Sequence, residues 1–116
     1  MKIKIGSALM ALGIMLGAFG AHALKKILTM LQLETFETGV KYLFLHALAL
    51  IILGILEKIY GSQKLKLPFI FFLIGILFFS FGCIAYALTG IKLIAMIVPI
   101  GGIAFILGWL TLFFKA

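Results

Sequence analysis

Few side chains in the chain are able to do chemistry, and its two imidazoles are the most informative. His22 and His46 are the histidines. On a helix, Tyr42 and His46 are four residues apart, so their side chains point the same way. Glu37 and Lys41 have the same spacing, in the order that favours an ion pair. We take these five residues as a candidate polar cluster.

Such a cluster allows three interpretations. Histidine titrates near neutrality, and ionisable groups inside a membrane often mark ion or proton paths. The structural alternative is a set of hydrogen bonds that tie helix ends together, with His22 meeting backbone or Glu37. A metal site is the poorest match, since two histidines without nearby cysteines or a third ligand leave it incomplete. We expect no metal and no cofactor.

Other catalytic and binding classes lack the residues they need. No nucleophile stands beside a base and no carboxylates are paired, so we expect no enzyme. The glycine-rich runs GAFGAH and PIGGIAFILG lie within apolar stretches, which argues against nucleotide binding. Small four-helix multidrug exporters depend on an acidic residue in their first helix, and the first apolar stretch here has none. Proton-coupled export of cations is therefore disfavoured.

Composition indicates an integral membrane protein. Hydrophobic residues make up 66% of the chain and charged residues 11%, with a mean hydropathy of +1.36. A soluble domain needs more polar surface than this. Charged residues bracket four uncharged stretches, and three of these reach the roughly 20 residues that a spanning helix needs. We expect one all-α transmembrane domain over residues 1–116, a compact left-handed bundle of four helices at about 3–24, 35–60, 68–88 and 92–114.

The net charge of +7 comes from ten lysines, nearly all of which flank apolar stretches. This placement predicts topology signals and contacts with anionic lipid, and no nucleic-acid partner. With four spans, both chain ends share a side with the turn at 57–67. That side holds six lysines and the other side four, which favours cytoplasmic termini.

The connection between the first two helices is unusual. Residues 25–40 are too apolar for an ordinary loop, and Thr29 and Gln32 have the spacing of a capping box. We expect either a short interfacial helical segment between the first two helices or an early start to the second helix.

The two prolines predict local irregularity. Pro68 suits the first turn of the third helix, where its missing amide hydrogen is tolerated. Pro99 is followed closely by Gly101 and Gly102, which predicts a break in the fourth helix. A break inside a bilayer must be covered by other helices or face water.

Small residues recur at seven- and four-residue spacing, which gives each helix a groove for close approach of another backbone. The pattern predicts packing inside a bundle, and the same faces suit a homo-oligomer. The same pattern of small residues helps to interpret the start of the chain. That segment has the layout of a secretory signal, with Ala21-His22-Ala23 as its cleavage site. Signal segments need no packed face, so we expect a retained helix. The helix-packing positions are Gly6, Gly13, Gly17, Gly20, Ala47, Gly54, Gly75, Gly82, Ala104 and Gly108.

Four segments carry a resemblance to a known family. They are LGAFGAHAL (16–24), TFETGVKYLFLHALAL (35–50), GILFFSFGCIAYALTG (75–90) and VPIGGIAFILGWL (98–110). In order and spacing they resemble the YgdD/YwdK-like family of small bacterial inner-membrane proteins. The resemblance covers residues 6–109 and implies a four-helix inner-membrane protein that is retained uncleaved and has no established activity.

The sequence therefore favours a small non-enzymatic membrane protein that acts through helix–helix contacts, as a homo-oligomer or as an accessory subunit of a larger membrane complex. The alternative is permeation or transport of a small solute or ion through a homo-oligomer. That path would use the His22/His46 face and the Pro99–Gly102 break, because unwound helices supply carbonyl ligands for ions. The partners we expect are membrane lipid and membrane protein.

Overall fold

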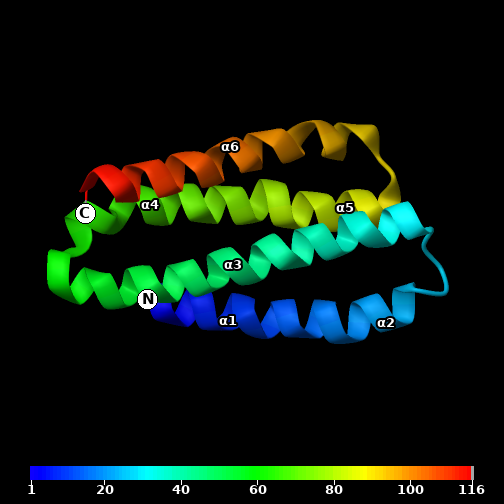
Figure 1. The fold of residues 1–116 in the computed structure, drawn as a ribbon, viewed down its shortest axis with the longest axis horizontal. Helices are drawn as coiled ribbons and strands as arrows, with labels where there is room; N and C mark the ends of the chain where they lie inside the picture. Colours follow the sequence, from blue (N-terminus) through cyan, green and yellow to red (C-terminus); the bar gives the residue numbers. More distant parts are fainter. Residues whose placement is uncertain (116) are drawn as a thin grey trace.

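Four long helical spans run up and down the molecule, joined by short connections (Figure 1). The computed structural model describes residues 1–115, without the side chain of residue 21. Each span is long and apolar enough to cross a membrane, so the prediction of an all-α membrane protein with four spans is confirmed. The elements are α1 (Lys2–Met15), π-helical turn η1 (Leu16–Gly20), α2 (Ala21–Leu24), α3 (Met30–Tyr60), α4 (Ser62–Gly75), π-helical turn η2 (Ile76–Ser80), α5 (Phe81–Thr89) and α6 (Lys92–Lys115).

Helix α3 begins earlier than the predicted residue 35 because its first turn is capped. The Thr29 side-chain oxygen accepts from the Gln32 amide at 3.2 Å, and the Thr29 amide donates to the Gln32 side chain at 2.9 Å. This capping box satisfies amides that have no partner within the helix. Of the two alternatives for residues 25–40, the structure has the early start of the second helix, and a separate interfacial helix is not found between Leu24 and Met30.

The turn between α3 and α4 is shorter than predicted. Gly61 has φ +86°, a conformation that favours glycine, and α4 starts at the next residue instead of near residue 68. Pro68 therefore lies inside the helix, and the prediction that it occupies the first turn is wrong. Its missing N–H frees the carbonyl of Lys64, near the exposed end of α4.

The predicted break at Pro99, Gly101 and Gly102 is wrong, because α6 is continuous from Lys92 to Lys115. Pro99 is exposed. Gly101 instead permits close contact with η2, since a Cβ at this position would meet the Phe79 amide nitrogen and lie 2.8 Å from the Phe78 carbonyl carbon. The π-helical irregularities fall in the first and third spans.

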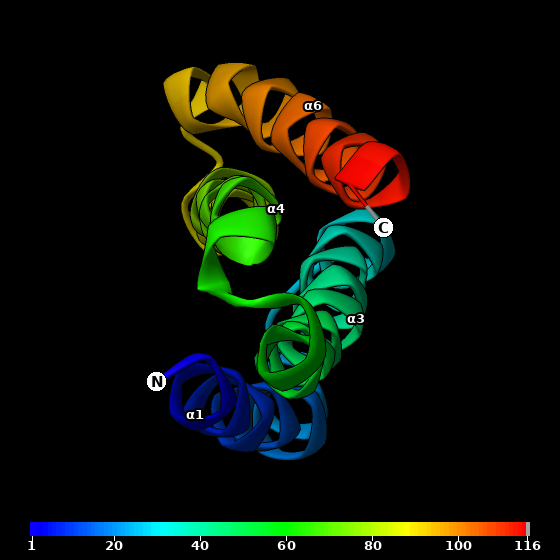
Figure 2. The ribbon, with the colours of Figure 1, turned by 90° about the vertical axis from the view of Figure 1, so that its left-hand side faces the viewer.

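The four spans form a zigzag when viewed end-on (Figure 2). Helix α1 packs along α3, α3 packs on α4, η2 and α5, and these three pack on α6. The chain thus consists of two antiparallel hairpins, α1–α3 and α4–α6, joined through the contact between α3 and the third span. Both chain ends lie at the same end of the molecule as the Gly61 turn (Figure 1).

The small residues singled out in the sequence lie where helices of the same chain meet. A Cβ at Gly6 would lie 2.7 Å from the Ala47 carbonyl oxygen, and one at Gly54 would lie 2.6 Å from the Ile3 side chain. Gly39 was not among them, yet a Cβ there would lie 2.6 Å from the Ser80 carbonyl oxygen. The remaining helix contacts are those of Gly13 with Phe44, Gly17 with Val40, Gly20 with Phe36, Gly75 with Phe105, Gly82 with Val98 and Gly108 with Phe72, while Ala47 and Ala104 are buried.

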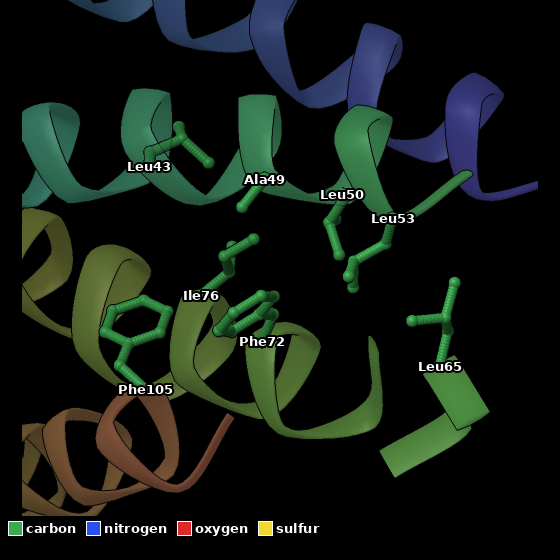
Figure 3. Packing of buried hydrophobic residues seen from close by; sticks show 8 residues of the cluster. All are labelled: Leu43, Ala49, Leu50, Leu53, Leu65, Phe72, Ile76 and Phe105. Carbon is green, nitrogen blue, oxygen red and sulfur yellow. The ribbon is translucent and has the colours of Figure 1, made fainter. Parts of the chain in front are cut away.

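The main buried cluster fills the space between α3 and the second hairpin (Figure 3). Helix α3 lies at the centre of the molecule and contributes half of its members. The cluster contains Leu43, Ala49, Leu50, Leu53, Leu65, Phe72, Ile76 and Phe105.

Near the Gly61 turn, the Lys2 ammonium pairs with the Glu57 carboxylate at 2.9 Å and lies 4.9 Å from the centre of the Phe69 ring. This ion pair ties the start of α1 to the last turns of α3.

The neighbouring glycines 101 and 102 provide a matched test of this packing. We expect Gly101→Ala to lower the free energy of unfolding by about 1–3 kcal/mol, because the new methyl group meets backbone atoms that cannot move aside. Gly102→Ala should be neutral or slightly stabilising, since its Cβ would lie 3.5 Å from the Phe79 ring. Unfolding in mild detergent measures both variants. Equal effects would contradict the close approach of α6 to η2.

Candidate functional site

An aromatic cluster surrounds His46 where α3, the third span and α6 meet. Helix α3 contributes Tyr42 and His46, four residues apart on one face. The His46 ring stacks on Phe105 of α6, with ring centres 3.6 Å apart and planes 13° apart. Phe72 of α4 meets the same imidazole edge-on at 5.3 Å, and Trp109 of α6 meets it at 5.8 Å. We call the set of Tyr42, His46, Phe72, Phe79, Phe105 and Trp109 the aromatic cluster.

Both ring nitrogens of His46 are hydrogen-bonded. Nδ1 lies 2.9 Å from the Tyr42 carbonyl oxygen, and the Trp109 indole N–H donates to Nε2 over 3.0 Å. A peptide carbonyl can only accept and an indole N–H can only donate. The imidazole is therefore neutral, with its proton on Nδ1. Because His46 is 4% exposed, these two bonds satisfy a polar group that would otherwise be buried without partners.

His46 lies deep in the membrane-spanning part of the chain. At a rise of about 1.5 Å per residue, it lies about 14 Å along α3 from Glu37 and about 17 Å from Glu57. The hydrocarbon core is about 30 Å thick, so His46 lies near its middle when the two glutamates flank it. A single polar cluster would need His46 near the membrane face where His22 lies, close to the end of α2, and the structure does not place it there.

The other three residues of the predicted polar cluster lie apart from the aromatic cluster. His22, Glu37 and Lys41 are exposed, whereas the rings of Tyr42 and His46 contact aromatic rings of the second hairpin. Within residues 1–115, the ion pair found is that of Lys2 with Glu57, so the predicted pairing of Glu37 with Lys41 is not formed. The five residues do not come together in one site.

Two clefts lie on different faces of α3. A groove of about 360 Å³ between η1 and α3 is lined by Gly17, Phe36, Glu37, Val40, Lys41, Phe44 and Leu45. A cleft of about 290 Å³ beside the aromatic cluster is lined by Tyr42, His46, Phe79, Gly102, Phe105, Ile106 and Trp109. The first is apolar with one acidic and one basic side chain at its rim. The second offers aromatic faces, and its imidazole is already engaged by Trp109.

The structure also answers which residues could hold a metal ion. No three side chains from His, Cys, Asp and Glu gather anywhere in the described part of the chain. Cys83 is buried in α5. Ser80, at the end of η2, is fully buried, and its hydroxyl has no hydrogen-bond partner among the described residues. The arrangement therefore provides a neutral, hydrogen-bonded imidazole inside aromatic packing and no cluster of free ligands.

Sequence reasoning missed the α6 half of the aromatic cluster. Phe105 and Trp109 are four residues apart and so share a helix face, as Tyr42 and His46 do on α3. That matching spacing was the available signal. It could not by itself show that the two faces meet, because the register between α3 and α6 depends on the third span between them.

The Trp109–His46 hydrogen bond can be tested by a double-mutant cycle. We expect Trp109→Phe to lower stability by about 1–3 kcal/mol, because it removes the donor and leaves a buried ring nitrogen unpaired. In a His46→Phe background the same change should cost less, since no unpaired nitrogen remains. Thermal unfolding of the four proteins measures the coupling, and purely additive effects would contradict the bond.

Comparison with known proteins gives consistent matches. The family described as "Protein of unknown function (DUF423)" matches residues 16–102. The UPF0382 membrane protein SSP2132 of Staphylococcus saprophyticus is 40% identical over 108 residues, covering 91% of this chain and 86% of its own length. The UPF0382 membrane protein YwdK of Bacillus subtilis is 36% identical over 107 residues, covering 91% and 85%. A UPF0382 membrane protein of Haemophilus influenzae is 37% identical over 97 residues, covering 84% and 77%. No solved structure matches.

Proposed function

Because the chain belongs to the DUF423 family, a family of membrane proteins of unknown function, we propose that it acts within the bilayer through lateral contacts of its helices with other membrane proteins. The resemblance to the YwdK-like family is confirmed by these matches. A family of unknown function supplies no activity, so the proposal rests on architecture.

The observation that carries the proposal is how little of the chain lies between the spans. The connections are residues 25–29, Gly61, and Gly90 with Ile91. Interfaces with soluble partners usually bury about 800 Å² on each side, which such connections cannot offer. The sides of the helices are the larger surface, and we propose that specific recognition by this chain uses them.

A non-enzymatic role is part of the proposal. Support comes from the state of the buried polar groups, because a catalytic base or nucleophile needs a free lone pair that faces a substrate. His46 uses both ring nitrogens in hydrogen bonds to its own chain, and Cys83 is buried. Lateral contact requires no such free group.

Permeation remains the alternative function, and it would need more than one copy. Side chains of the main buried cluster fill the space between α3 and the second hairpin. The continuous α6 removes the unwound segment that was expected to supply carbonyl ligands. A path for a solute would therefore have to run between chains, along faces that also serve assembly.

We also propose a bacterial inner-membrane location with both termini in the cytoplasm. The relatives named above come from bacteria. Both termini and the Gly61 turn lie at one end of the molecule (Figure 1). That end carries more lysines than the other, and cytoplasmic flanks are enriched in basic residues. Lys58, Lys64 and Lys66, which are exposed there, would contact anionic lipid.

Native mass spectrometry of the tagged protein, extracted gently from its own membrane with lipid attached, tests the proposal. We expect a defined assembly, either several copies of the chain or the chain with a larger membrane protein. A matched sample kept in harsh detergent should give the monomer mass and so shows that the assembly depends on the membrane. A bare monomer in both samples would overturn lateral contact as the function.

A further inference from the structure

The two hairpins are built on the same plan. The run GIMLGAFG at 13–20 recurs as GILFFSFG at 75–82, with glycine, isoleucine, phenylalanine and glycine at the same places. Both runs contain or overlap a π-helical turn, η1 in the first span and η2 in the third. Since π-helical turns are rare, the presence of one within each of the two runs indicates two versions of one hairpin.

The contacts inside the two hairpins also correspond. Gly13 faces the ring of Phe44 in the first hairpin, and Gly75 faces the ring of Phe105 in the second. One turn further along, Gly17 faces Val40, while its counterpart Phe79 faces Gly101. At this second contact the glycine is on the first helix of the first hairpin but on the second helix of the second hairpin. The two positions that face each other are nevertheless the same in both hairpins. This fixes which residues of the two hairpins are equivalent.

The hairpins are joined by a contact between the second helix of one and the first helix of the other. At its centre, Gly39 of α3 lies against Ser80 of η2, where a Cβ at Gly39 would be 2.6 Å from the Ser80 carbonyl oxygen. The equivalent of Gly39 in the second hairpin is Ile100 of α6, and the equivalent of Ser80 in the first is Ala18 of η1. Both Ile100 and Ala18 are exposed.

Over the rest of the contact between α3 and the third span, residues that are buried there again have exposed equivalents in the other hairpin. On α3, Tyr42, His46, Ala49 and Leu53 point towards the third span, and three of these four are buried. Their α6 equivalents are all exposed, and they are Ile103, Leu107, Leu110 and Phe114. On the first span, Ile14 is 55% exposed, whereas its equivalent Ile76 is 2% exposed. The outer face of α6 and the outer face of α1 and η1 are therefore the equivalents of the two faces that meet where α3 packs on the third span.

We propose that these two faces bind each other between copies of this chain, with α6 of one copy packed on α1 and η1 of the next. The contact would use the same two faces as the one between α3 and the third span, with Ile100 beside Ala18 of the neighbour. Because Ile100 carries a side chain where α3 has Gly39, the two helices would lie farther apart than α3 and η2 do. Both faces lack charged side chains over this region, so no buried charge opposes their approach. This inference rests on the proposed function and names the partner as a second copy.

The geometry of the two hairpins determines the kind of assembly. In the end-on view both hairpins lean the same way, so a shift along the zigzag relates them more closely than a half-turn does (Figure 2). A contact of this kind is head-to-tail, because it joins two different faces. Repetition of a head-to-tail contact gives a ring when the rotation closes and an open row when it does not. A closed two-fold dimer is not expected.

Cysteine cross-linking in intact membranes tests this contact directly. The test protein is the full chain with Cys83→Ala, Ala18→Cys and Ile100→Cys, oxidised with copper phenanthroline. A parallel series keeps Cys83, which is buried, so that the result does not depend on its replacement. The matched control is Met15→Cys with Ile106→Cys, at exposed positions of the same two helices. Their equivalents in the other hairpin, Leu77 and Leu45, are also exposed, so these positions lie outside the contact.

We expect the Ala18/Ile100 pair to give a ladder of dimers, trimers and higher forms, about tenfold or more faster than the control pair, because a disulfide needs Cα atoms within about 7 Å. Each single-cysteine variant should stay monomeric, and co-expression of the two single variants should give dimers that do not extend. A dimer as the final product of the double variant would overturn the head-to-tail contact.

The proposed function and this inference can fail separately. Cross-linking no faster than the control, together with a defined assembly by native mass spectrometry, would overturn docking between α6 and α1 and leave lateral contact with a different partner. Slow cross-linking together with a bare monomer would overturn both. A ladder from the test pair supports both.

Discussion

Close contact between a glycine on one helix and a large side chain or backbone on its neighbour holds this structure together. In a bilayer the lipid is as apolar as a leucine side chain, so burial alone does not bring helices together, and dense packing must do so. Gly13 against Phe44 and Gly75 against Phe105 supply this packing in the two hairpins. Gly39 against Ser80 then joins the hairpins. Loss of a glycine at these positions would push whole helices apart.

The aromatic cluster depends on this packing and adds direction to it. Phe105 reaches His46 because Gly75 leaves room for its ring between α4 and α6. Trp109 then donates to the imidazole, which links α6 to α3 across the third span. A hydrogen bond of this kind fixes how the two helices are turned relative to each other, which dispersion contacts alone do less sharply. Both nitrogens of the buried imidazole are thereby hydrogen-bonded within the chain, and the lateral contacts proposed above would use the outer faces of α1 and α6.

The sequence predicted the four spans and the small residues between helices, because both follow from local hydropathy and spacing. It failed where tertiary contact overrides local preference. Pro99 was expected to break α6, yet the helix continues, and Gly101 serves close approach to η2. The five-residue polar cluster was inferred from positions along single helices. Its separation into Tyr42 and His46 on one face of α3 and Lys41 on another depends on how α3 is rotated, and the chain's own spacing does not reveal that rotation. The recurrence of residues 13–20 as 75–82 was visible in the sequence, but its meaning came from the matching contacts.

A double-mutant cycle on Gly75 and Phe105 tests the central claim most directly, with the free energy of unfolding of four proteins as the measurement. A Cβ at Gly75 would lie 2.8 Å from Cγ of the Phe105 ring. We expect Gly75→Ala to cost about 1–3 kcal/mol in the natural chain and little or nothing in a Phe105→Leu background, where the ring is gone. The same cost in both backgrounds would show that the glycine does not make room for this ring, and would contradict the account of how the hairpins are held together.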